Sequence, residues 1–384
     1  MKRSVIAWIF FLALAQLLLF PADGSAPVAS AETGQRISDH FDGSHYFNPG
    51  TSHPPPGQEP GRSRASWIWR YLFGNDWPEW SGVKKVAPGP PPPVRVSKGD
   101  LSVIPIGHST FLIQMDGLNI LTDPIWSERS SPVSWAGPKR HRDPGIRFEE
   151  LPPIDVVLVS HNHYDHLDLP TLSRLAEKHS PRAIVPLGNL ALVRGAGISD
   201  VEEYDWWQSV RISPDVVVTL VPAQHFSSRT LWDRNETLWC GFVVSGPAGN
   251  VFFAGDTGYG PHFGEIARRF SPIRVALLPI SPFRPKRVQE PSPFSPSVHM
   301  GPAEAVQAHL DLGAQLSIAS HFQVFQLGMD GFDDAVNELS AILPERNLHS
   351  DTFLAPLPGR AIMLTRRPPE AADPQHLETY GLNR

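Results

Sequence analysis

Four apolar runs that each lead into a potential metal ligand constrain the fold of this chain more than any other feature. Runs of this length and composition are typical of buried β-strands. The runs and the ligands that follow them are 155–160 with His161, 216–221 with His225, 251–255 with Asp256, and 316–320 with His321. Because strand ends at one edge of a sandwich converge, the pattern predicts one site built from four separate strands.

The segment from His161 to His166 adds further ligands to this predicted site. It holds His161, His163, Asp165 and His166, and four ligands within six residues cannot all reach one ion without crowding. On a tight loop that runs into a helix they point in two directions, so we expect two metal ions. Zinc binds imidazole and carboxylate groups and keeps a position open for water in catalytic sites. Carboxylate-rich ligation would also admit iron or manganese.

Two observations narrow the metal chemistry. Cys240 is the only cysteine, which excludes both an intramolecular disulfide and a thiolate zinc site. A lone histidine beside a strand is more typical of a structural group than of a ligand. The compact cluster, with three partners on other strands, favours the metal site over that alternative.

The remaining apolar runs predict an α/β protein. Further strands are expected at 101–106, 110–115, 118–122 and 275–280, and Asp116-Gly117 is a strong hairpin signal between two of them. Helical patterns cover residues 169–178, 260–270, 303–312 and 333–343. Strands mixed with single helices, without an internal repeat, predict two sheets sandwiched between helices. Residues 282–298, rich in proline and serine, are expected to form a long surface loop.

The amino-terminal part has the composition of a targeting segment followed by a linker. Lys2 and Arg3 precede an apolar run over residues 5–20, and residues 29–31 offer small side chains for cleavage. We therefore predict a signal peptide over residues 1–31, with an uncleaved anchor as the alternative. Either predicts an exported chain that is periplasmic or membrane-associated.

Residues 32–98 are rich in proline and contain an aromatic cluster, and we interpret them as an extension before a catalytic domain at 99–370 and a tail at 371–384. The cluster comprises Trp67, Trp69, Tyr71, Phe73, Trp77 and Trp80. These rings are expected to pack on the main domain, and contact with a membrane surface is the alternative. The formal net charge of -6 disfavours a nucleic-acid partner. The sequence leaves the oligomeric state open, a dimer included.

Several motifs outside the histidine cluster resemble the N-acyl-phosphatidylethanolamine-hydrolysing phospholipase D family. They span 121–125, 137–140, 151–155, 161–168, 205–207 and 253–259. The tyrosine within the histidine cluster and the segment Gly255-Asp-Thr-Gly-Tyr259 are the most specific of them, and the resemblance covers most of residues 100–345. It implies a metallo-β-lactamase fold, which is a four-layer αβ/βα sandwich.

The resemblance also implies a ligand for each metal position. One zinc would be bound by His161, His163 and His225, and the other by Asp165, His166 and His321, with Asp256 bridging both. It places a further active-site histidine at His299, and in the mechanism that we predict Asp165 and Asp256 are catalytic because they orient a metal-bridging hydroxide. From chemistry alone, His299 is either a phosphate contact or proton donor, or a loop residue without a role. His108 is interpreted as structural, with support of a metal ligand as the alternative.

Three functions follow as hypotheses. The first is phospholipase D-type hydrolysis, in which a metal-bridging hydroxide cleaves N-acyl-phosphatidylethanolamine-like lipids to phosphatidate and an N-acylethanolamine. The second keeps the metals but makes the chain a lactonase or another ester hydrolase, because fold alone does not choose the substrate. The third is an envelope-anchored structural or binding protein with a vestigial site. The stretch 282–298 does not align with the family, so the sequence leaves the substrate open.

Overall fold

The computed structural model describes residues 38–49, 80, 87–230, 232–283 and 298–365. From His40 onward it forms two seven-stranded sheets. The first contains, in spatial order, β14 (Ile362–Leu364), β1 (Leu101–Gly107), β2 (Thr110–Met115), β3 (Leu118–Thr122), β4 (Val156–Leu158), β5 (Arg182–Pro186) and β6 (Val201–Tyr204). The second contains β13 (Phe353–Leu354), β12 (Leu316–Ser320), β11 (Ile273–Pro279), β10 (Gly249–Phe253), β9 (Gly241–Gly246), β8 (Val217–Val221) and β7 (Ser209–Arg211).

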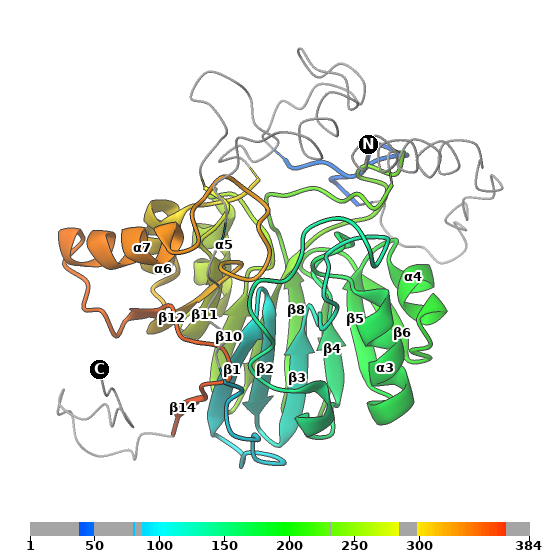
Figure 1. Cartoon of the computed structure of the whole chain (residues 1–384), viewed down its shortest axis with the longest axis horizontal. Coiled ribbons are helices and arrows are strands. Elements are labelled where there is room, and N and C mark those ends of the chain that lie inside the picture. Colours follow the sequence, from blue (N-terminus) through cyan, green and yellow to red (C-terminus); the bar gives the residue numbers. More distant parts are fainter. Residues whose placement is uncertain (1–37, 50–79, 81–86, 231, 284–297, 366–384) are drawn as a thin grey trace, which may run out of the picture. The chain divides into compact units, whose positions relative to one another are not determined.

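Helices cover the outer face of each sheet, which gives four layers (Figure 1). The first sheet is covered by α3 (Leu169–His179) and α4 (Leu190–Gly195). The second is covered by α5 (His262–Phe270), α6 (Pro302–Leu312) and α7 (Asp334–Glu345). A short 3-10 helix, η1, spans Phe148–Glu150. The predicted four-layer αβ/βα sandwich is therefore confirmed.

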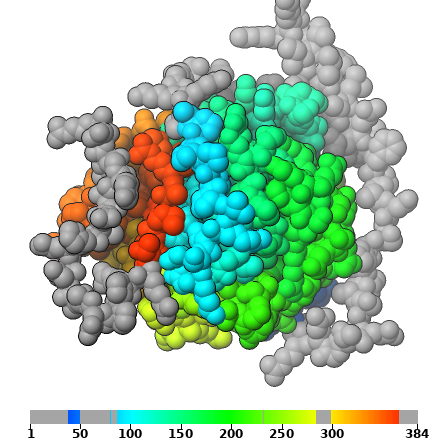
Figure 2. Space-filling model, turned by 90° about the horizontal axis from the view of Figure 1, so that it is seen from below, coloured from blue at the N-terminus to red at the C-terminus, as the bar shows by residue number. Residues whose placement is uncertain are grey.

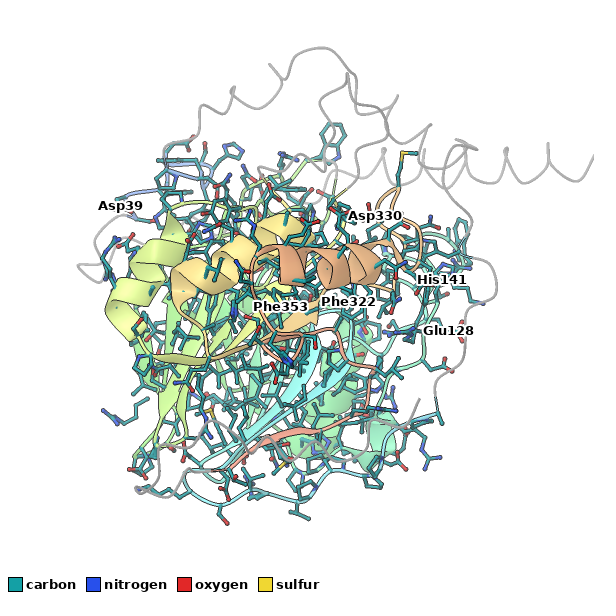
Figure 3. The ribbon with its side chains drawn as sticks, turned by 90° about the vertical axis from the view of Figure 1, so that its left-hand side faces the viewer. Asp39, Glu128, His141, Phe322, Asp330 and Phe353 are labelled. Atoms are coloured by element: carbon teal, nitrogen blue, oxygen red, sulfur yellow. The ribbon has the colours of Figure 1, made fainter. Side chains whose placement is uncertain are left out.

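Three apolar cores hold the layers together. The central core lies between the two sheets and includes Phe111, Phe242 and Phe253, all almost fully buried. A second core joins the β10–β12 region to α5, α6 and α7, and Phe353 and Phe322 lie beside these helices (Figure 3). The third joins the first sheet to α3 and α4. Strands such as β1 and β12 are buried throughout, because both of their faces are covered.

Strand direction brings the predicted site to one edge. In the first sheet β3, β4 and β5 are parallel, and in the second β10, β11 and β12 are parallel. β8 runs antiparallel to β9, which runs antiparallel to β10, so β8 and β10 point the same way. The carboxyl ends of β8, β10 and β12 therefore lie at the same edge of the second sheet. At one edge of the first sheet, β14 pairs with the buried strand β1, and the segment that contains β14 is visible in orange-red on the surface (Figure 2).

Part of the predicted amino-terminal extension packs on the two-sheet structure. His40 stacks on Trp206 at a centroid distance of 3.9 Å, and its Nε2 lies 3.0 Å from a carboxylate oxygen of Asp205. Trp80 is buried and donates its indole N–H to the carbonyl of Asp330 at 2.8 Å. At His40 and Trp80, the segment before residue 99 thus packs on the rest of the fold, as expected for the rings of the extension.

Several sequence predictions fall on other stretches of the chain. Residues 1–31, most of the aromatic cluster, residues 284–297 of the expected loop and the tail at 371–384 lie outside the described residues. Among the described residues, no helix is both long enough and apolar enough to cross a membrane. The predictions of a signal peptide, of export and of a membrane contact therefore stay predictions.

Candidate metal centre

The seven predicted metal ligands come together at the carboxyl ends of four strands. His161, His163, Asp165 and His166 lie on the loop between β4 and α3, while the other three follow strands of the second sheet. Those three are His225 after β8, Asp256 after β10, and His321 after β12. All seven side chains are buried or nearly so. Their assignment as ligands stays a prediction, and their placement satisfies its geometric requirement.

The first predicted zinc group is a cluster of three imidazoles. The ligand atoms of His161, His163 and His225 all lie within 4.8 Å of one another. Nε2 of His161 is 2.8 Å from Nδ1 of His163, and Nε2 of His225 is 3.2 Å from the same nitrogen. Burial lowers the pKa of His163 and of His225 to about 3, so both rings are neutral at pH 7. Neutral imidazole is the form that binds zinc.

The second predicted group combines a carboxylate with two imidazoles. The ligand atoms of Asp165, His166 and His321 lie within 4.8 Å of one another and of His108. Oδ2 of Asp165 is 3.2 Å from Nε2 of His166 and 3.3 Å from Nε2 of His321. The chain thus provides a second cluster with a different, more acidic donor set.

Asp256 lies between the two groups. Its Oδ2 is 3.0 Å from Nε2 of His321, 3.2 Å from Nε2 of His166 and 3.8 Å from Nε2 of His225. Gly255 places it there: this glycine has a φ of 60°, and a Cβ at its position would lie 2.7 Å from Cβ of Ser160. Only glycine fits this close approach in a left-handed conformation, and the arrangement suits a ligand shared by two ions.

Unsatisfied polar atoms and the charge balance test whether metal ions fit this site. Within the part of the chain that the structure describes, Nε2 of His166 and Oδ1 of Asp256 make no hydrogen bond although both are buried. Burial alone would lower the pKa of His321, but the neighbouring carboxylates raise it to about 9. Burial likewise opposes protonation of His166, and three carboxylates still raise its pKa well above the usual value. The buried carboxylates of Asp165 and Asp256 thus stabilise positive charge near them, which divalent ions would supply.

Hydrogen bonds outside the cluster orient three of the histidines. Nδ1 of His225 donates to the carbonyl of Val298 at 2.8 Å, and Nδ1 of His321 donates to the carbonyl of Ser281 at 2.8 Å. Nδ1 of His166 bonds to Oδ2 of Asp123 at 2.7 Å. In each case the Nε2 atom is left to face the cluster. Such partners fix the tautomer and the orientation of metal-bound histidines.

Asp123 contacts the predicted ligand His166, and the reasoning on strand ends missed it. It follows β3, is fully buried, and also accepts hydrogen bonds from the backbone N–H and the hydroxyl of Ser160 at 2.7 and 2.6 Å. The signal was present, because Asp123 belongs to the motif 121–125 and follows an apolar run as the other site residues do.

His299 lies beside the first group. It precedes α6, is 7% exposed, and its Nδ1 is 3.8 Å from Oδ2 of Asp256. The ligand atoms of His225, Asp256 and His299 lie within 4.8 Å of one another. The structure therefore brings His299 into the site, whereas its catalytic role stays a prediction.

Asn48 links the amino-terminal segment to the site. Its side-chain amide donates to the carbonyl of His225 at 2.7 Å, and its oxygen accepts from the N–H of His225 at 3.2 Å and from Nε1 of Trp239 at 3.1 Å. One buried side chain thus holds the backbone of a predicted metal ligand from both sides. No sequence motif pointed to this contact, which joins residues 177 positions apart.

Replacing Asn48 by alanine is expected to destabilise the protein by about 1–3 kcal/mol, because buried donors and acceptors lose their partner. Urea denaturation monitored by circular dichroism measures this. Ser44→Ala is the matched control, since Ser44 is exposed in the same segment and bonds only to its neighbours. Equal stability of the two variants would contradict the role given to Asn48.

Comparisons with known proteins identify the superfamily of this chain. A family model described as "Beta-lactamase superfamily domain" matches residues 118–322. An uncharacterised protein of Mycobacterium tuberculosis is 36% identical over 290 residues, which cover 73% of this chain and 74% of that protein. The chain belongs to the metallo-β-lactamase superfamily, and it is a metal-dependent hydrolase of that superfamily.

Two relatives carry the name of the family that the motifs resemble. N-acyl-phosphatidylethanolamine-hydrolyzing phospholipase D 1 of Caenorhabditis elegans is 35% identical over 233 residues, which cover 58% of this chain and 64% of that protein. The mitochondrial protein of that name from Saccharomyces cerevisiae is 33% identical over 261 residues, with coverage of 65% and 54%. The match therefore spans less than two thirds of either relative.

A solved structure supports the fold alone. An isothiocyanate hydrolase from Delia radicum gut bacteria aligns with 69% of this chain and 100% of its own, at a TM-score of 0.54 and 18% identity.

Proposed function

We propose that this chain is a phospholipase D-type phosphodiesterase. It would hydrolyse lipids of the N-acyl-phosphatidylethanolamine type with two bound ions, which we propose to be zinc. The observation that carries the proposal is the pair of ligand clusters that meet at Asp256, together with the two relatives named as phospholipases D. A pair of metal ions suits phosphodiester cleavage, because it activates water and neutralises the negative charge on the oxygens of the attacked phosphate.

The residues divide into ligands and a substrate contact. His161, His163 and His225 would hold one ion. Asp165, His166 and His321 would hold the other, and Asp256 would be a ligand to both. His299 would contact a substrate oxygen. Burial lowers the pKa of His299 to about 3, so at pH 7 its neutral ring can donate one N–H hydrogen bond but lacks the second, acidic proton of an imidazolium. We therefore favour a phosphate contact over a proton donor for this residue.

A substrate panel tests the proposal. Purified chain is incubated at neutral pH with N-acyl-phosphatidylethanolamine in mixed micelles, and in parallel with an acyl lactone. We expect phosphatidate and an N-acylethanolamine as products, faster turnover of the lipid than of the lactone, and loss of both activities after chelation. Metal-independent turnover of the lipid would overturn the proposal. Faster turnover of the lactone would instead favour the ester hydrolase.

A further inference from the structure

His108 lies beside the second ligand group, and its ligand atom is within 4.8 Å of those of Asp165, His166 and His321. It follows β1 in the tight turn to β2, is 4% exposed, and has a φ of 57° in the left-handed region. Its carbonyl accepts the backbone N–H of His321 at 3.0 Å. The left-handed conformation is energetically unfavourable for a residue other than glycine, and residues held in it cluster at functional sites. The turn that presents His108 is thus tied to the strand end that presents His321.

The side chain of His108 contacts two predicted ligands. Its Nε2 is 2.9 Å from Oδ2 of Asp165, and its ring packs on that of His321 at a centroid distance of 4.0 Å. An ionised carboxylate only accepts hydrogen bonds, so Nε2 of His108 carries the hydrogen and Nδ1 carries a lone pair. The imidazole therefore holds the same carboxylate oxygen that His166 and His321 approach, at the shortest of the three distances.

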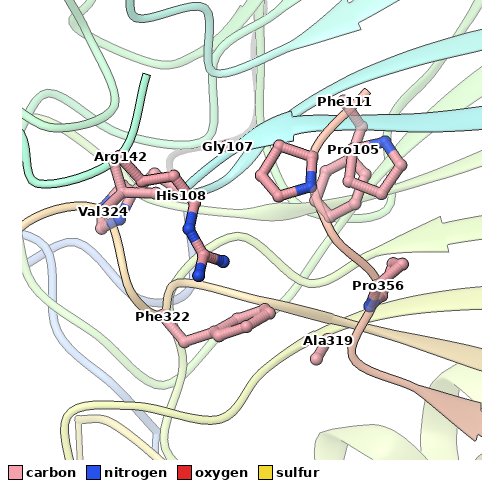
Figure 4. A pocket seen from close by; sticks show the side chains of 10 residues that line it. Pro105, Gly107, His108, Phe111, Arg142, Ala319, Phe322, Val324 and Pro356 are labelled. Atoms are coloured by element: carbon pink, nitrogen blue, oxygen red, sulfur yellow. The ribbon is translucent and has the colours of Figure 1, made fainter. Parts of the chain in front are cut away.

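The other ring nitrogen of His108, Nδ1, takes no part in the hydrogen bond to Asp165. It is buried and has no hydrogen-bond partner among the described residues. His108 lines a narrow cavity of about 10 Å³ between apolar side chains such as Pro105 and Phe322, with Arg142 alongside (Figure 4). That volume holds about one water molecule. No side chain in the described residues competes with Asp165 for His108, so the carboxylate alone sets its tautomer.

We propose that His108 is a positioning residue that fixes Asp165 for the second metal ion. Without it, the Asp165 carboxylate would lose its closest side-chain hydrogen bond and could rotate away from the ligand group. The inference rests on the proposed metal assignment, but it does not depend on the lipid substrate.

Two amide substitutions separate positioning from ligation. The amide nitrogen of glutamine reaches about as far as Nε2 of histidine, whereas that of asparagine is shorter and reaches only the Nδ1 position. We expect His108→Asn to weaken binding of one of two metal ions by about 10–100-fold, and His108→Gln to restore most of that affinity. Competition with a chromogenic chelator measures both affinities, and thermal melting of the metal-free variants shows whether each is folded. Should His108→Asn fail to fold, His108→Phe takes its place, since it keeps the ring shape without the donor.

A matched control and the contrary outcomes complete the test. His309→Gln alters another buried histidine, which bonds to Ser317 away from the site, and should bind both ions as the wild type does. Wild-type affinity in His108→Asn would overturn the inference. Equal loss in His108→Gln and His108→Asn would also overturn it, because the imidazole would then act as a ligand itself. If the wild type binds no metal, the proposed function fails instead.

Discussion

Asp256→Asn is expected to abolish binding of both metal ions and to lower turnover by at least about 10³-fold, beyond the roughly 10–100-fold that loss of an outer partner costs. The substitution keeps the shape of the side chain but removes its charge. Oδ2 of Asp256 lies within 3.8 Å of an Nε2 atom in each ligand group, so one change acts on both. Metal analysis of the purified variant measures the first effect, and the lipid assay measures the second.

Asp168→Asn is the control for this prediction. Asp168 is another buried aspartate of the same loop, and it bonds to the hydroxyls of Ser127 and Thr171 rather than to the ligand groups. The variant should lose some stability but keep both ions. Retention of two ions by Asp256→Asn would contradict the shared position of this carboxylate.

Metal binding at pH 7 is expected to release two protons, one from His166 and one from His321. In the metal-free chain, burial opposes protonation of both rings, but the neighbouring carboxylates raise the pKa of His166 well above its usual value and that of His321 to about 9, so both rings favour the protonated form. A metal ion needs neutral imidazole and must displace these protons. The affinity for metal ions should therefore rise with pH, by about tenfold per pH unit for each proton that binding releases. The part of this rise that is due to His321 should end above its pKa of about 9.

Calorimetry in buffers of different ionisation enthalpy counts the released protons. His163 and His225 should contribute none, because burial already lowers the pKa of each to about 3. An affinity that stays constant between pH 6 and pH 8 would show that the two rings are neutral without metal.

The sequence predicted the strands that carry the site because their apolar runs are continuous and each ends at a ligand. The run at 251–255 before Asp256 illustrates this: β10 covers Gly249–Phe253, so the strand overlaps the run and ends two residues before the run does. The sequence did not predict short or half-exposed strands such as β7 and β14, because a few residues at a sheet edge show no clear apolar periodicity. The sequence did not predict β9 either. This strand lies inside the second sheet, but it begins at Gly241 and ends at Gly246, so its apolar run is short.

The outer layer of the site could be predicted only in part. Asp123 follows a strand and was within reach of the same rule. Asn48 was not, because its contact with His225 depends on how a distant segment packs, and an isolated asparagine in a proline-rich stretch carries no signal. His108 was interpreted as structural, and only its distance to Asp165 and its contact with His321 indicate a role in positioning.

The metal content of the wild-type chain tests the central claim most directly. The protein is purified without chelators from zinc-supplemented medium, and metal and protein are quantified in the same sample by mass spectrometry and amino-acid analysis. The account predicts two ions per chain, whose removal abolishes lipid hydrolysis and whose return restores it. Fewer than one ion per chain, or hydrolysis that persists after the ions are stripped, would contradict it.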